Sequence, residues 1–88
     1  MSLKELDIRS KAKQIYIQSV KSAPELYLRR LEKGELAEGV DLQTIATNSF
    51  FCELGNLKQS EKDYIMHCIC DQFIDEVDQT QAILNCFF

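Results

Sequence analysis

The fold is decided by residues 60–88, which read SEKDYIMHCICDQFIDEVDQTQAILNCFF. At about 100° of rotation per residue, as in an α-helix, the apolar side chains fall on one face and the acidic ones on the other. The apolar arc consists of Met66, Ile69, Phe73, Val77, Leu84 and Phe87, with Ile65, Cys70, Ile83 and Phe88 at its edges. This pattern predicts a long amphipathic C-terminal helix at the centre of an all-α domain.

Three further helices are predicted upstream, at about residues 3–21, 24–33 and 42–54. Pro24 is placed at the start of the second helix because proline lacks the N–H that a helix interior requires. Gly34 fits a left-handed residue after a helix, and Asp41 fits the N-cap of the third helix. Residues 35–39 could form one more helical turn, which would make a fifth helix. We therefore expect a small bundle of four or five helices in one domain, residues 1–88.

The first helix carries apolar residues on two faces. The main stripe is Ile8, Ala12, Ile15, Tyr16 and Ser19, and a weaker second stripe is Leu6, Ile17 and Val20. Two such faces indicate a helix in the middle of a bundle or at a subunit contact. In the second helix, Leu28 and Leu31 are expected to point inward.

The length of the last helix raises the question of a second copy. An unbroken helix over residues 61–88 would be about 42 Å long, which exceeds the width of so small a domain. It must either break near residues 78–80 or project and pack on another molecule. With the two-faced first helix, this predicts a homodimer.

Composition and charge exclude several classes of protein. The chain is 45% apolar and 27% charged, with a net charge of -4, which is ordinary for a globular domain. Residues 1–33 carry a net +4 and residues 34–88 a net −8, so the two halves either attract each other or steer a charged partner. The acidic balance makes nucleic acid an improbable partner.

No apolar run spans a bilayer and no signal-peptide pattern is present, which predicts a cytoplasmic protein with no membrane partner and four reduced cysteines.

Residues 81–88, which read QAILNCFF, form the most specific motif of the chain. They resemble the PCNA-interacting peptide, in which a glutamine, an aliphatic residue and two aromatic residues recur at this spacing. Gln81, Leu84, Phe87 and Phe88 occupy those places. The resemblance implies docking on a sliding clamp, with the apolar side chains filling a pocket and the glutamine binding beside it. The basic residues that usually flank the motif are absent.

Candidate catalytic and metal-binding groups are sparse. His67, Cys68 and Cys70 have side chains of the kind that zinc prefers, but a Cys-x-Cys spacing on a helix directs the thiols apart. The carboxylates of Asp71, Asp75 and Asp78 share one helix face, which is typical of a solvated surface and, as an alternative, of a DNA-phosphate mimic. We therefore predict no metal site, no cofactor and no enzymatic activity.

The sequence thus predicts a non-catalytic intracellular interaction domain, such as a small regulator or adaptor, with an unidentified protein partner. Its small size alone is the basis for expecting a phage or mobile-element origin. The alternative is a replication- or repair-associated protein that docks on a sliding clamp through Gln81, Leu84, Phe87 and Phe88.

Overall fold

The described part of the chain is entirely helical apart from its connections. The computed structural model describes residues 3–73 and 77–88, with residues 3 and 4 as backbone alone. These ranges contain four α-helices and no strand: α1 (Leu3–Lys33), α2 (Leu42–Leu54), α3 (Gln59–Gln72) and α4 (Gln79–Phe87). The predicted all-α class is therefore confirmed for them.

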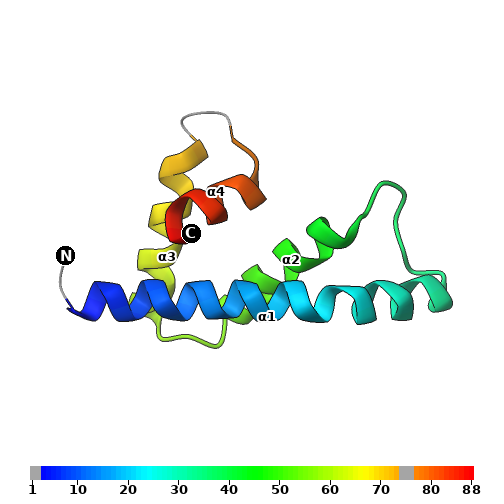
Figure 1. Ribbon diagram of the computed structural model, residues 1–88, viewed down its shortest axis with the longest axis horizontal. Coiled ribbons are helices and arrows are strands. Elements are labelled where there is room, and N and C mark those ends of the chain that lie inside the picture. Colours follow the sequence, from blue (N-terminus) through cyan, green and yellow to red (C-terminus); the bar gives the residue numbers. More distant parts are fainter. Residues whose placement is uncertain (1–2, 74–76) are drawn as a thin grey trace.

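Helix α1 is the element on which the other three helices are assembled (Figure 1). It runs along the 45 Å long axis of the molecule. Helix α2 lies along its C-terminal half, whereas α3 and α4 stand side by side over its N-terminal half. The two halves of α1 consequently have different surroundings.

The prediction of a helix boundary at Pro24 was wrong, because α1 continues through this residue to Lys33. Ala23, before the proline, is buried with Ile45 and Ala46 of α2, and Leu26 and Tyr27, after it, pack against the same cluster. Contacts with α2 therefore lie on both sides of Pro24. The Ser22 hydroxyl bonds to main-chain carbonyls of the preceding turn instead of capping a new helix. Tertiary packing therefore overrides the local signal.

The prediction of one long C-terminal helix was also wrong. Helix α3 ends at Gln72, and α4 begins at Gln79 after its N-cap Asp78. The Asp78 carboxylate accepts a 2.7 Å bond from the main-chain N–H of Gln81. A break near residues 78–80 was the predicted alternative. It is right in kind, but Asp78 is the N-cap of α4 and residues 79 and 80 already belong to that helix. Folding back brings Ile69 of α3 and Ile83 of α4 into the same core, which a straight helix would not allow.

Helix α3 begins at Gln59, with Lys58 as its N-cap, two residues before the predicted start at Glu61. The boundaries around α2 and the end of α1 agree with the sequence. Asp41 caps α2 by accepting a 2.8 Å bond from the main-chain N–H of Thr44, and α2 ends at the predicted Leu54. Gly34 follows α1 with φ 69°, in the left-handed region that favours glycine. Residues 35–39 form a non-helical connection with a turn at residues 38 and 39, so the fifth helix is absent from the described chain.

Two apolar clusters hold the helices together. The larger one joins all four helices through these buried residues: Ile8, Ala12, Tyr16, Phe50, Leu54, Ile65, Ile69, Ala82, Ile83 and Phe87. The smaller one joins the C-terminal half of α1 to α2 through Ala23, Ile45 and Ala46. The main stripe predicted for the first helix is thus the buried face of α1.

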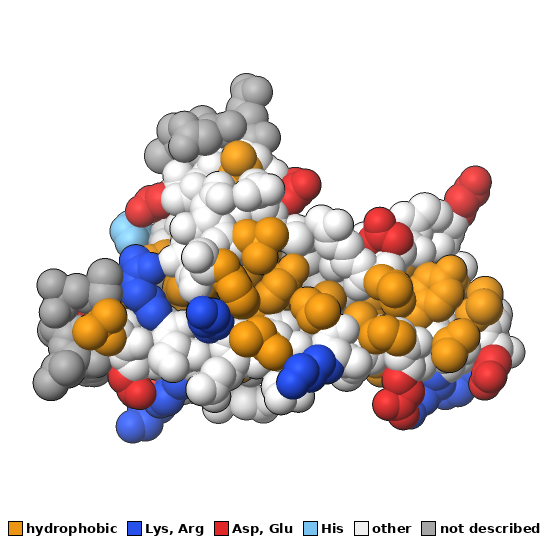
Figure 2. All heavy atoms as spheres, in the orientation of Figure 1, with side chains coloured by type: hydrophobic (Ala, Val, Ile, Leu, Met, Phe, Trp, Pro, Cys, Tyr) orange, Lys and Arg blue, Asp and Glu red, His pale blue; other side chains and the backbone are white. Residues whose placement is uncertain are grey.

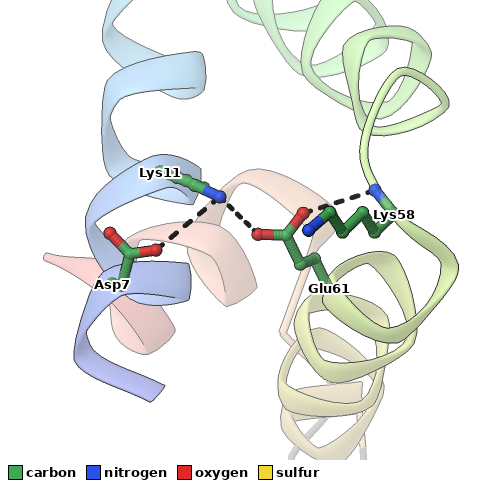
Figure 3. Close-up of polar contacts among 4 residues, drawn as sticks. All are labelled: Asp7, Lys11, Lys58 and Glu61. Atoms are coloured by element: carbon green, nitrogen blue, oxygen red, sulfur yellow. Dashed lines mark hydrogen bonds and ion pairs between the residues drawn. The ribbon is translucent and has the colours of Figure 1, made fainter. Parts of the chain in front are cut away.

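An ion pair fixes the crossing of α1 and α3 (Figure 3). The Nζ atom of Lys11 lies 2.5 Å from one carboxylate oxygen of Glu61, whose side chain is 9% exposed, and 3.6 Å from Asp7. The other oxygen of Glu61 accepts a 3.3 Å bond from the main-chain N–H of Lys58, at the start of α3. One carboxylate therefore both caps α3 and ties it to α1.

This ion pair should make stability depend on pH. The bond from Lys11 lowers the pKa of Glu61 below its usual 4.5, so its contribution is present above that value and is lost as pH falls through the lowered pKa. We expect wild type to lose more unfolding free energy than Glu61→Gln between about pH 6 and about pH 3 in urea titrations. Glu38→Gln, in an exposed turn, is the control and should behave like wild type. Equal losses in Glu61→Gln and wild type would contradict this role.

Pro24 leaves the carbonyl of Val20, one turn earlier, without an intrahelical donor. We expect Pro24→Ala to supply that donor and to raise the free energy of unfolding by roughly 1–3 kcal/mol, measured by urea denaturation. A lower stability of the Pro24→Ala variant would show that the packing of Ala23 on α2 depends on a proline-specific distortion of α1.

Candidate protein-interaction surface

The second stripe of α1 is left uncovered by the other helices. Leu6 and Val20 are 50% and 46% exposed, and Ile17 is half-buried. Because α1 is continuous, the same face extends past Pro24 to Leu28 and Leu31. The first helix was predicted to lie either in the middle of a bundle or at a subunit contact. In the described chain no other helix covers the second stripe, so α1 does not lie in the middle of a bundle.

The prediction that Leu28 and Leu31 point inward was wrong, since they are 57% and 54% exposed. Ala23, Leu26 and Tyr27 face α2 in their place. The reason is the phase of the helix: continuing the 100° rotation of residues 3–21 through Pro24 puts both leucines on the second stripe. The sequence therefore contains the periodicity that places Leu28 and Leu31 on the second stripe, but the predicted boundary at Pro24 divided it between two helices.

A shallow apolar groove of about 500 Å³ lies at the C-terminal end of this face. It is formed by α1 and the segment leading into α2, and is lined by Pro24, Tyr27, Leu28, Val40, Asp41 and Leu42. Figure 2 shows apolar side chains gathered over this end of α1 and, beside α4, over its middle. We call the exposed side of α1, from Leu6 to Leu31, the apolar face.

The C-terminal motif is folded into α4 and is only partly accessible. Phe87 is buried in the core at 9% exposure, and Leu84 packs against the same cluster. Gln81 is exposed and its side chain bonds Asn85 at 2.8 Å. Phe88 is 55% exposed. Insertion of both aromatic rings into a clamp pocket would therefore require α4 to leave the domain.

Three contacts hold the end of α4 on α1. The Phe88 ring lies 5.5 Å from the Tyr16 ring, edge to face, and 5.3 Å from Nζ of Lys13. Arg9 donates a 2.5 Å bond to the main-chain carbonyl of Cys86 and a 3.1 Å bond to the Tyr64 hydroxyl. The bond with Tyr64 raises the pKa of Arg9. The guanidinium, which stays charged in proteins, links α1, α3 and α4. Sequence reasoning did not find this role, because no local pattern connects these residues.

The candidate metal and acidic residues are dispersed. His67 lies 3.5 Å from Asp71, and both side chains are exposed on α3. Cys70 is also exposed. The Cys86 thiol instead donates to the main-chain carbonyl of Cys68, and burial raises the pKa of this thiol. Within residues 3–73 and 77–88, no group of three or more His, Cys, Asp or Glu side chains is placed to hold a metal ion. Asp75 of the acidic row lies outside the described residues.

No family model, curated protein or solved structure matches this chain. Among the described helices, none has the length and apolar character needed to cross a membrane. The geometry of the apolar face is therefore the main guide to function.

The two terminal aromatic residues should differ in what they contribute to stability. We expect Phe87→Ala to lower the free energy of unfolding by about 3–5 kcal/mol, because it empties part of the core. Phe88→Ala removes mainly the contacts with Tyr16 and Lys13 and should cost about 1–2 kcal/mol. Urea denaturation of both variants measures this. Unchanged stability in both, together with lost binding to a purified sliding clamp, would instead favour the clamp hypothesis.

Proposed function

We propose that this protein is a non-catalytic interaction domain, a small regulator or adaptor, that binds a protein partner through the apolar face of α1. The observation that carries the proposal is the alignment of exposed apolar residues along one side of a single helix. Scattered apolar side chains are common on protein surfaces, but several of them aligned along one helix mark a contact site.

The apolar face has the features of a docking surface. It combines flexible aliphatic side chains, such as Leu28 and Leu31, with a rigid aromatic ring, Tyr27, at the edge of a groove. Charged residues lie beside it, including the ion pair of Glu25 with Arg29, 3.1 Å apart on an exposed part of α1. An apolar centre with a charged rim is the usual composition of a protein interface.

The face is also separable from the fold. Leu28 and Leu31 belong to neither apolar cluster, so replacing them should leave the core intact. Binding and folding can therefore be measured independently. The clamp hypothesis lacks this separation, since Phe87 serves the core.

The test compares Leu28→Glu combined with Leu31→Glu against a control, Gln18→Glu combined with Lys33→Gln, which changes the charge equally away from the apolar face. Each immobilised protein is used to capture partners from extracts of the source cells. A captured protein is then purified and titrated by calorimetry. We expect affinity for it to fall at least about tenfold in the first variant and to stay within about twofold of wild type in the control.

Both double variants should unfold within about 0.5 kcal/mol of wild type, because all four positions are exposed. Wild-type binding should also show a negative heat-capacity change, the mark of apolar burial. Equal binding by both double variants, or a wild type that neither retains a partner nor self-associates, would contradict the proposal.

A further inference from the structure

The apolar face of α1 carries the repeat of a two-stranded coiled coil. Steps of four and three residues connect the positions Leu6, Ser10, Lys13, Ile17, Val20, Pro24, Tyr27 and Leu31. Side chains at alternating steps of four and three residues lie in one narrow row along a helix. We call this row of eight positions the seam. Only Ser10 and Lys13 interrupt the apolar series, and Tyr27, which also packs against the smaller cluster, is half-buried. A seam of this kind fits a second helix better than a flat surface.

We propose that the helix occupying this seam is α1 of a second copy, packed antiparallel, so that the protein is a homodimer. This inference rests on the proposed function and names the partner of the same surface. Reversing one copy places the polar and charged positions of one seam opposite uncharged positions of the other. A parallel pair does not achieve this.

In the reversed register that overlaps the helices fully, Leu6 lies opposite Leu31 of the second copy, and Ile17 lies opposite Val20. These layers recur on both sides of the two-fold axis, giving an apolar centre and two apolar ends. Lys13 lies opposite Pro24, where its aliphatic stem can pack while the ammonium group reaches water. A parallel pair would instead set Lys13 against Lys13 and Pro24 against Pro24, which adds charge repulsion to the seam.

The size of the contact sets the expected strength. A seam along the 45 Å length of the molecule, at about 10 Å helix width, covers roughly 450 Å² of each copy. The neighbouring Phe88 of α4 and Leu42 of α2, both about half-exposed, can extend this area. Stable interfaces cover about 800 Å² per partner, so the expected dimer is weak, with a micromolar dissociation constant.

The first experiment is sedimentation equilibrium of the full chain from about 5 to about 300 µM, a range that brackets micromolar affinity. We expect wild type and the control Gln18→Lys to self-associate. Val20→Lys, which adds the same charge at the centre of the seam, should remain monomeric with an unchanged melting temperature. Monomeric wild type over the whole range, or an undiminished dimer of Val20→Lys, would overturn the inference.

The direction of packing needs a second pair of variants. Leu6→Lys combined with Leu31→Glu should self-associate about tenfold more tightly than Leu6→Lys combined with Leu31→Lys, because only reversed packing sets the introduced opposite charges face to face. Equal dissociation constants for the two would overturn the antiparallel arrangement.

These outcomes are distinguishable from failure of the proposed function. Monomeric wild type whose capture of another protein still requires Leu28 and Leu31 would overturn the dimer alone and assign the apolar face to a different partner. Self-association that Val20→Lys abolishes, with no other protein captured, would support the second copy as the occupant.

Discussion

The continuity of α1 through Pro24 is the constraint on which the rest of the structure depends. Proline removes one intrahelical bond, and an isolated peptide of this sequence would be expected to break there. The burial of Ala23 against Ile45 and Ala46 holds the two sides in line. Because α1 stays straight enough to span the molecule, it can offer one side to the core and the other to a partner.

The buried side of α1 combines apolar packing with charge. Lys11 and Arg9 lie next to the core and reach Glu61 of α3 and the carbonyl of Cys86 in α4. One contact between the net positive N-terminal region and the acidic remainder is therefore an ion pair, that of Lys11 with Glu61. This agrees with the simpler of the two interpretations of the charge asymmetry, in which the halves attract each other, and it leaves the apolar face with little charge apart from Lys13.

Much of the fold could be predicted from the sequence where the signals are local. The N-cap Asp41 and the left-handed Gly34 each follow from one residue's own conformational preference. The errors arose where a local signal competes with distant packing. Pro24 indicated a helix boundary, but packing against α2 keeps α1 continuous there. The periodicity of residues 60–88 indicated one helix, because the apolar faces of α3 and α4 both pack into the same core.

The candidate surface was predictable in part for the same reason. The second stripe at Leu6, Ile17 and Val20 was visible in the sequence, but its continuation to Leu28 and Leu31 required the correct helix length. Arg9 could not have been singled out, since its partners Tyr64 and Cys86 are brought near it only by the tertiary fold.

The apolar face calls for an explanation that stability does not provide. Leu28 and Leu31 lie outside both clusters, so exchanging them for polar residues would cost the monomer little and would improve its solubility. A single such leucine would need no explanation. Repetition at heptad spacing over most of a 31-residue helix is different, because each apolar position gains free energy only if another surface covers all of them together. The pattern is therefore better explained by binding than by folding, and the surface that best matches a helical seam is another helix.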